Sequence, residues 1–307
     1  MLHGHEEAIR RGLFVRDLDI RQQQVEAVLA VKIAENGLNA AARGGRDEGG
    51  VIVGAQRLQQ GETVLGTMLS EIYVPNIMRL MKNYDFDFIL IDGEHGYFDD
   101  TQIANLTAVA NGIDLPVLVR IATCDRAIIT RLMDMGVHGI LLSGTESVED
   151  AKLLADLCRY APDGCRGVST FRAHTGYQHK DMHVLMENAN RRTLVMVQIE
   201  STHAAEITPE LLAIPGVDGA IIGPNDMSQE MGILGQYQHP RMLHALQQTV
   251  DAAKRTGKWS GIITTNQALL EEGKRLGMHF FSVGSELNMI ASGAQQVVEK
   301  FGSLKEA

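Results

Sequence analysis

Eight short runs of apolar residues, separated by segments of helical periodicity, constrain most strongly what this chain can fold into. A β-strand that is buried on both faces appears as an unbroken Val/Ile/Leu run, and its regular alternation with helices favours a parallel sheet. The sequence therefore predicts eight strands, near Val64–Leu69, Phe88–Asp92, Val117–Ile121, Gly139–Leu142, Leu194–Glu200, Ala220–Gly223, Ser260–Thr264 and Phe280–Val283.

Eight strands that are each followed by a helix favour a (β/α)₈ TIM barrel, for which about 250 residues suffice. The chain has 307 residues, and we assign residues 56–307 to the barrel. An open doubly wound sheet remains the alternative fold. Residues 1–55 do not share the strand–helix alternation: Asp19–Asn36 has helical periodicity and Arg43–Gly50 is rich in glycine. We expect an N-terminal helical arm that packs on the barrel or on a neighbouring subunit.

Composition excludes several classes of partner. The formal net charge is −10, whereas binding to nucleic acid phosphates requires a basic surface. We find no apolar run of about 20 residues, so we expect no membrane partner. Only three cysteines occur and none forms a Cys-x-x-Cys pair, which argues against a disulfide framework or a zinc knot. This cysteine usage favours the reducing cytoplasm.

Charged residues stand where four of the apolar runs end, in FILIDGEH, VLVR, LVMVQIE and AIIGPND. The carboxyl ends of parallel strands lie at one face of a sheet, and in (β/α)₈ barrels that face carries the active site. The topology therefore predicts that residues far apart in the sequence are neighbours in space. They are Asp92, Glu94, His95, Arg120, Glu200 and Asp226.

Two of these carboxylates, Glu200 and Asp226, are candidate metal ligands. Hard divalent cations such as Mg²⁺ and Mn²⁺ bind carboxylate oxygens and keep open positions for water or substrate. The alternative is that either acid caps the helix that follows it, and for Asp226 in GPNDMS this alternative has weight.

His95, Asp92 and Arg120 are the candidate catalytic residues. Histidine titrates near neutral pH and can act as a general base, and Asp92 could fix its tautomer. Arg120 keeps its proton, so a buried strand end that carries it requires an anionic partner. That partner is either a substrate carboxylate or enolate, or simply Glu94 or Asp92. For His95 the alternative is a loop-capping role.

Lysine is absent from the predicted carboxyl ends of the strands. Lys82 and Lys258 both precede strands, on the opposite face. Covalent imine chemistry requires such a lysine, so the sequence favours a metal as the electrophile. Three histidines, His174, His179 and His183, lie in one polar segment, but a zinc site there would require further ligands.

The motifs together resemble the HpcH/HpaI family of class II pyruvate-dependent aldolases, including its citrate-synthase-like branch. DGEHG, the VR pair, RYAPDGCRGVS, VQIES and GPNDMS occur in the family's order and spacing, from about Leu58 to Phe301. The resemblance implies a cytoplasmic, metal-dependent lyase on a TIM barrel. It also implies a homo-oligomer, a hexamer or trimer of dimers, whose C-terminal helix packs on a neighbouring subunit.

By the same resemblance, Glu200 and Asp226 hold the divalent metal, and Gln198 contacts the bound 2-oxo acid. Backbone N–H groups around Asn225 and Asp226 would receive the carboxylate of pyruvate. Arg120 would steady the enolate oxygen. His95 with Asp92 would handle the proton through a metal-bound water.

Two segments depart from the family pattern. LLSGTES, residues 141–147, stands where the family usually has a turn that contains proline, and RGVSTFRAHTGY is closer to the citrate-synthase-like branch. We expect both segments to border the substrate. The predicted function is a metal-dependent aldolase for 4-hydroxy-2-oxo acids. The alternatives are a condensation of oxaloacetate with acetyl-CoA in siderophore biosynthesis and a non-catalytic barrel scaffold.

Overall fold

The structure is a computed structural model that describes residues 57–58, 61–178 and 181–305. The predicted arm, residues 1–55, lies outside the described residues, so the arm and the domain boundary beside it stay predictions. All eight predicted strands lie within the described part of the chain.

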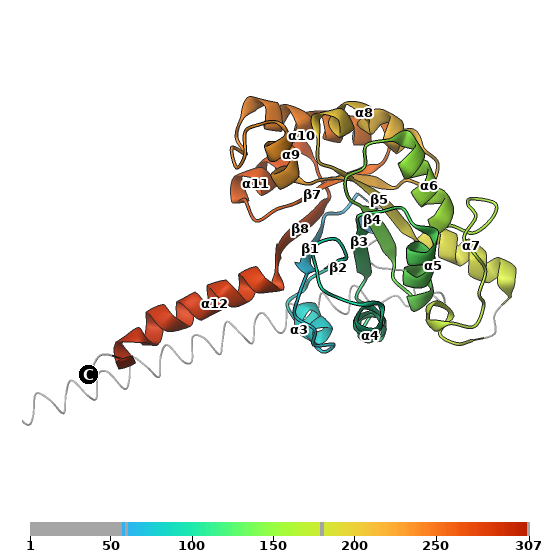
Figure 1. Cartoon of the computed structure of the whole chain (residues 1–307), viewed down its shortest axis with the longest axis horizontal. Coiled ribbons are helices and arrows are strands. Elements are labelled where there is room, and N and C mark those ends of the chain that lie inside the picture. Colours follow the sequence, from blue (N-terminus) through green and yellow to red (C-terminus); the bar gives the residue numbers. More distant parts are fainter. Residues whose placement is uncertain (1–56, 59–60, 179–180, 306–307) are drawn as a thin grey trace, which may run out of the picture. The chain divides into compact units, whose positions relative to one another are not determined.

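The strands form one closed parallel barrel in which each pairs with its neighbours in chain order and the last pairs with the first (Figure 1). This closing pair confirms the barrel and excludes the open sheet. The first four predicted strands match the observed bounds, and the other four differ from them by one or two residues at their ends. The strands are β1 (Val64–Leu69), β2 (Phe88–Asp92), β3 (Val117–Ile121), β4 (Gly139–Leu142), β5 (Leu194–Ile199), β6 (Gly219–Ile222), β7 (Trp259–Ile263) and β8 (Phe280–Ser285).

Helices follow the strands and surround the barrel, except the C-terminal helix, which extends away from it (Figure 1). Several begin at a polar residue that accepts a backbone N–H three residues on, as Asp99, Asp125, Ser147 and Ser201 do. The helices are α3 (Ile77–Asn83), α4 (Asp100–Asn111), α5 (Arg126–Met135), α6 (Val148–Cys158), α7 (Met182–Arg192), α8 (Thr202–Ala213), α9 (Pro224–Glu230), α10 (Pro240–Thr256), α11 (Gln267–Leu276) and α12 (Glu286–Phe301), with short 3₁₀ turns at Ala173–Thr175 and Gly302–Lys305.

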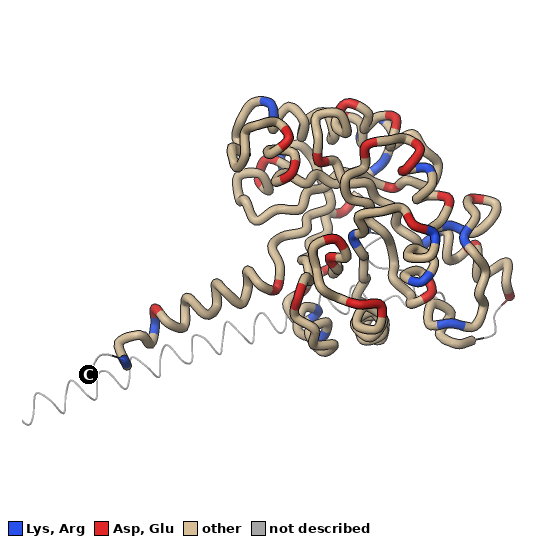
Figure 2. Tube along the Cα trace, in the orientation of Figure 1, with Lys and Arg blue, Asp and Glu red and all other residues tan. Residues whose placement is uncertain are grey.

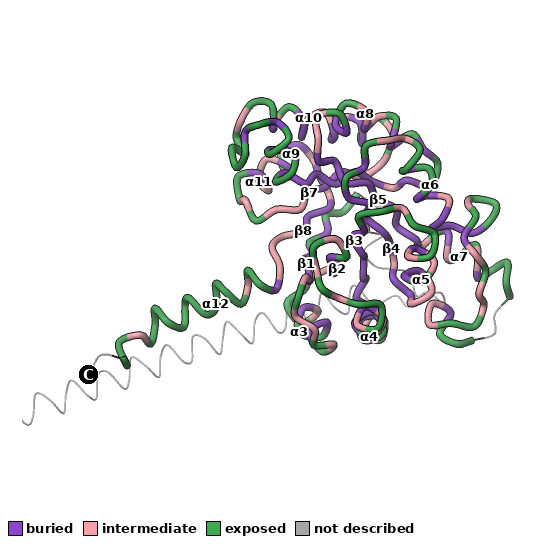
Figure 3. Tube along the Cα trace, in the orientation of Figure 1, coloured by how far each residue is buried: buried purple, intermediate pink, exposed green. Residues whose placement is uncertain are grey.

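The hydrophobic core has two layers, because alternate residues of each strand point to opposite faces. Figure 3 shows that the strands are largely buried. One layer fills the barrel interior, where the rings of Phe88 and Phe280 stack with centroids 4.2 Å apart. Gly66 makes room for this pair, since a Cβ there would lie 2.4 Å from the Phe88 ring. The other layer lies between the strands and the helices. A filled interior leaves the strand ends as the place for chemistry.

Acidic and basic residues are interspersed over the outer elements (Figure 2). No helix in the described ranges is both long and apolar enough to span a membrane. The C-terminal helix α12 differs from the others, because almost all of its residues are exposed, including Ile290, Val297, Val298 and Phe301. Its buried residue is Glu286.

Candidate active site

Alternation along the strands places four of the predicted site residues on the inner side of the barrel. Leu90, Leu118 and Met196 belong to the interior layer. Asp92, Arg120 and Gln198 each follow one of these residues by two positions, and Glu200 follows Gln198 by two, so all four share the inward face. All four are buried. Asp92 and Arg120 are also direct partners in the β2–β3 register.

Arg120 forms a two-pronged ion pair with Asp92. Its Nε and Nη2 donate to the two carboxylate oxygens at 3.0 and 2.7 Å, and Nε lies 3.3 Å from an oxygen of Glu94. Burial opposes ionisation of Asp92, but the hydrogen bond and charge of Arg120 outweigh it and hold the pKa of Asp92 below its usual value. The salt bridge considered from the sequence is therefore present. This ion pair uses Nε and Nη2 of the guanidinium. Nη1 makes no hydrogen bond within the described residues, so its N–H groups can bind another acceptor.

His95 lies on the β2–α4 loop and is exposed to solvent, with Nε2 4.0 Å from a carboxylate oxygen of Glu94. Asp92 contacts the backbone of this loop: its Oδ1 accepts the N–H groups of Glu94 and His95 at 3.1 and 3.2 Å. In this structure Asp92 therefore fixes the loop that carries His95, while the imidazole ring lies beside Glu94.

Glu200 immediately follows β5 and accepts two hydrogen bonds. Its Oε2 accepts the backbone N–H of Gly144 at 2.8 Å, and its Oε1 accepts a hydrogen bond from Nε2 of Gln198. Burial raises the pKa of Glu200, and the nearby negative charges of Asp226 and Glu94 raise it further. A bound cation would relieve this crowding of negative charge, because it favours the ionised carboxylate.

Asp226 and Asn225 belong to the first turn of α9, which begins at Pro224 directly beyond β6. Both are exposed, and Asn225 Oδ1 accepts a hydrogen bond of 2.6 Å from the hydroxyl of Tyr237. The N-cap position of α9 is Gly223, so Asp226 is not the residue that caps the helix. The negative charge of Asp226 contributes to the raised pKa of Glu200.

A notch at Gly223 adjoins these carboxylates. A Cβ at Gly223 would lie 2.5 Å from Glu200 Oε1 and 2.7 Å from Gln198 Nε2. In addition, the Oε1 atom of Gln198 is buried without a hydrogen-bond partner among the described residues. The space left by the missing side chain of Gly223 and the unpartnered oxygen of Gln198 both fit a site that binds a cation and an oxygen-rich ligand. The described residues contain no group of three or more His, Cys, Asp and Glu side chains that could hold a metal ion.

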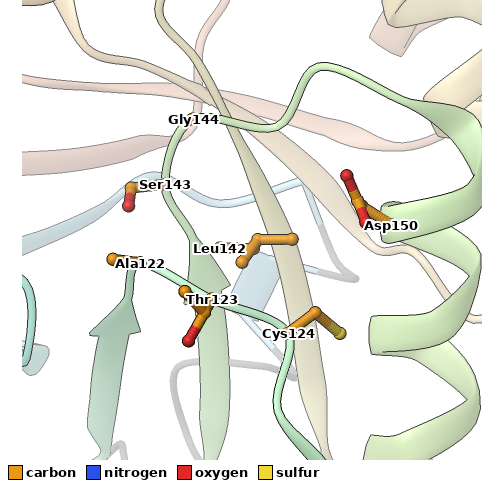
Figure 4. Close-up of a pocket in the computed structure, with 7 residues that line it drawn as sticks. All are labelled: Ala122, Thr123, Cys124, Leu142, Ser143, Gly144 and Asp150. Carbon is orange, nitrogen blue, oxygen red and sulfur yellow. The ribbon is translucent and has the colours of Figure 1, made fainter.

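Residues that sequence analysis did not single out border this centre. Gly144, with φ of +53°, follows β4 and turns its N–H toward Glu200, a conformation that favours glycine. Beside it lies a cavity of about 270 Å³ between the β3–α5 and β4–α6 loops (Figure 4). Burial raises the pKa of Cys124, which lines this cavity, to about 11, so its thiol is protonated. The full lining is Ala122, Thr123, Cys124, Leu142, Ser143, Gly144 and Asp150.

Lys82 and Lys258 lie before strands of the barrel, as the sequence predicted. Lys258 directly precedes β7, and Lys82 Nζ donates to the backbone oxygen of Asp114, just before β3. Of the polar-segment histidines, His174 lies beside Asp134 and Tyr160, His183 belongs to α7, and His179 is outside the described residues.

Comparison with known proteins identifies the family. The model of the HpcH/HpaI aldolase/citrate lyase family matches residues 69–292, which includes every predicted site residue. The chain belongs to this family. A relative from Escherichia coli, named 4-hydroxy-2-oxo-heptane-1,7-dioate aldolase, is 31% identical over 270 residues, which are 88% of this chain and 96% of the relative.

Solved structures agree with this assignment. The HpcH/HpaI aldolase from Desulfitobacterium hafniense superposes with a TM-score of 0.75 at 30% identity and covers 82% of this chain and 96% of that one. The citrate synthase SbnG, at 22% identity, has a TM-score of 0.73 and covers 82% of this chain and 98% of that one, which shows a shared fold. This member of the HpcH/HpaI family is an enzyme, a carbon–carbon lyase of the aldolase type.

Proposed function

We propose that this aldolase cleaves and forms 4-hydroxy-2-oxo acids through a pyruvate enolate and depends on a divalent cation, Mg²⁺ or Mn²⁺. The substrate class is supported by the name of the Escherichia coli relative, whose dioate substrate is a 4-hydroxy-2-oxo acid. The observation that carries the proposal is the convergence of Glu200, the charge of Asp226 and the notch at Gly223 near the Arg120 guanidinium.

Glu200 and Asp226 are the residues that would hold the cation. Two carboxylates from one protein leave positions open, as hard divalent ions require when they also bind substrate. When bound, the cation supplies Lewis-acid polarisation of the 2-oxo carbonyl, which stabilises developing charge by several kcal/mol. The hydrogen bond from Gln198 Nε2 to Glu200 Oε1 would hold this carboxylate beside the notch.

The oxo acid would be oriented by residues of β3, β5 and α9. Gln198 would contact the oxo acid, and the backbone N–H groups around Asn225 and Asp226 would receive its carboxylate at the first turn of a helix, where N–H groups are unsatisfied. The Nη1 donors of Arg120 face the oxygen of the enolate. Asp92 holds the guanidinium in place through two hydrogen bonds, so the positive charge is ordered before the reaction.

Cleavage breaks the bond between C3 and C4 of the substrate. The C4 hydroxyl loses its proton and becomes the carbonyl of an aldehyde, while the bonding electron pair passes to the C2–C3 enolate. Protonation at C3 then gives pyruvate. His95 would accept the first proton through water and return one, since a residue exposed at the loop tip has direct access to solvent.

The decisive assay is pyruvate release from 4-hydroxy-2-oxo acids by purified protein, with and without EDTA and with Mg²⁺ or Mn²⁺ restored. We expect activity only with the cation, and no mass increase after borohydride treatment with pyruvate. A trapped adduct, or activity that persists after chelation, would refute the metal-dependent enolate.

Two further properties belong to this proposal. We propose a cytoplasmic enzyme, because Cys124, Cys158 and Cys165 are all free thiols. We also propose a homo-oligomer, a hexamer or trimer of dimers, which the exposed apolar side chains of α12 support. Citrate formation from oxaloacetate and acetyl-CoA is the rival to be assayed beside aldol cleavage.

A further inference from the structure

Glu286 is a buried carboxylate outside the proposed set of ligands and catalytic residues. It is the first residue of α12, directly after β8, and is only 1% exposed. Glutamate is almost never fully buried unless it is paired. A helix cap does not explain it, because Ser285 already caps α12 by accepting the N–H of Asn288.

The partners of Glu286 are three consecutive backbone donors. Its Oε1 accepts the N–H groups of Ser70, Glu71 and Ile72 at 2.8, 2.7 and 3.2 Å. These residues begin the β1–α3 loop. Hydrogen bonds to an ionised acceptor are roughly twice as strong as neutral ones, so one oxygen holds the start of this loop at the carboxyl end of β8. The other oxygen, Oε2, is buried without a hydrogen-bond partner among the described residues.

The loop that Glu286 holds is in turn packed against the loop of His95. The carbonyl oxygen of Ser70 accepts the N–H of Tyr97 at 3.0 Å. Gly96 lies where the two loops meet. A Cβ on this residue would lie 2.7 Å from the backbone carbonyl oxygen of Ser70 and 2.2 Å from that of Asp92. The two loops therefore meet backbone to backbone with no room for a side chain, so a displacement of Ser70 displaces the residues next to His95.

We propose that Glu286 is a positioning residue for His95, acting through Ser70 and the β2–α4 loop. The proposal rests on the proposed function in one respect, the role of His95 in proton transfer. Glu286 itself touches no reacting atom. Glu286, directly after β8, holds the β1–α3 loop through hydrogen bonds, and this loop contacts the β2–α4 loop through Ser70. The side chain of Asp92 also binds backbone N–H groups of the β2–α4 loop.

Amide hydrogen exchange tests this coupling without any assay of activity. Glu286→Gln keeps the shape and an acceptor oxygen but removes the charge that strengthens the three hydrogen bonds. We expect faster exchange both at residues 70–72 and at residues 94–97, measured on the full chain. The matched control is Glu271→Gln, an exposed glutamate of α11 that should leave both segments unchanged. Faster exchange at residues 70–72 alone would overturn the proposal.

A double-mutant cycle tests the functional consequence. We expect Glu286→Gln to lower kcat for aldol cleavage about tenfold and to change KM for the oxo acid less than about twofold, because the groups that bind it come from β3, β5 and α9. In a His95→Asn background the same substitution should lower kcat less than about twofold. An equal loss in both backgrounds, or wild-type kcat in His95→Asn itself, overturns the positioning role. Absence of pyruvate release by the wild-type enzyme would instead refute the proposed function, and the exchange experiment would still decide the coupling of the two loops.

Discussion

Arg120 shows, at the scale of single residues, how a structural contact and a binding role can coexist in one side chain. Its side chain is 8% exposed and is held by Asp92 and, more loosely, by Glu94. A guanidinium has five N–H donors, so these contacts do not exhaust it. The ion pair orders the guanidinium, and Nη1 makes no hydrogen bond within the described residues. The two interpretations that the sequence left open are therefore compatible.

Replacement of Arg120 by lysine should reduce turnover while the fold persists. Lysine keeps the charge but loses the planar fork that binds Asp92 with two hydrogen bonds. We expect kcat to fall roughly a hundredfold, the usual cost of one oxyanion donor. Steady-state kinetics and thermal unfolding of Arg120→Lys are the measurements, with Arg275→Lys, in an exposed pair with Glu272, as control. Unchanged turnover would leave Arg120 a purely structural role.

Gly223→Ala should block the ligand notch with little change in the rest of the barrel. The new methyl group would lie within 2.7 Å of both Gln198 Nε2 and Glu200 Oε1, so these side chains would have to move. We expect calorimetric titration with Mn²⁺ and pyruvate to show binding weakened at least about tenfold. Gly112→Ala, where the nearest atom is 3.4 Å away, is the matched control. Wild-type affinity in Gly223→Ala would remove the notch from the site.

The apolar runs were sufficient to place Asp92, Arg120 and Glu200 near the carboxyl ends of strands. Asp92 ends β2, Arg120 lies one residue before the end of β3 and Glu200 follows β5, and the two-residue repeat of a strand fixes the face on which they lie. The partners of these side chains were not predictable in the same way. The N–H of Gly144 and the hydroxyl of Tyr237 reach the site from loops, and their direction depends on backbone angles that no periodic pattern encodes.

At the scale of elements, the loops after β1, β2 and β4 supply backbone N–H groups that bind buried carboxylates at the mouth of the barrel. The LLSGTES segment, which departs from the proline-containing turn, contains Gly144 in a left-handed conformation with its N–H on Glu200. The sequence predicted that this segment borders the substrate. The sequence did not predict the contact between Glu286 and the β1–α3 loop, because 214 to 216 residues separate the partners.

His138, which precedes β4, should make the stability of the barrel sensitive to mild acid. Its Nδ1 accepts the N–H of Val117 at 3.1 Å, which requires a neutral ring, and burial lowers its pKa from 6.5 to about 4. The unfolded chain therefore binds this proton at higher pH than the folded one, and stability is lost as pH falls from 6.5 toward 4. Urea unfolding between pH 7 and pH 4.5 measures the loss. His138→Asn, which keeps an acceptor, should show a smaller decrease over this range, whereas an equal decrease would assign the effect to other groups.

At the scale of the whole molecule, barrel closure brings together residues from β2, β3, β5 and α9 that are up to 134 positions apart, from Asp92 to Asp226. The alternation of strands and helices predicted this closure. The assembly state was not derivable from that alternation, because exposed apolar residues on α12 become visible only when the helix is placed on the barrel.

Deletion of residues 1–50 should leave a folded and active barrel. Strands β1 to β8 and the proposed site all lie within residues 64–285, and β8 closes on β1 without earlier residues. Circular dichroism, size-exclusion chromatography and pyruvate release of the truncated chain are the measurements. An insoluble or inactive product would show that the N-terminal segment completes the core or a subunit interface.

The central claim, enolate formation at a cation held by Glu200 and Asp226, is tested most directly by exchange of the methyl protons of pyruvate in D₂O. Proton NMR follows the loss of the methyl signal with no aldehyde present, so the second substrate plays no part. We predict exchange that requires Mg²⁺ or Mn²⁺, stops with EDTA and is lost in Glu200→Gln but retained in Glu271→Gln. Exchange that continues at the same rate after chelation, or in Glu200→Gln, would contradict the account.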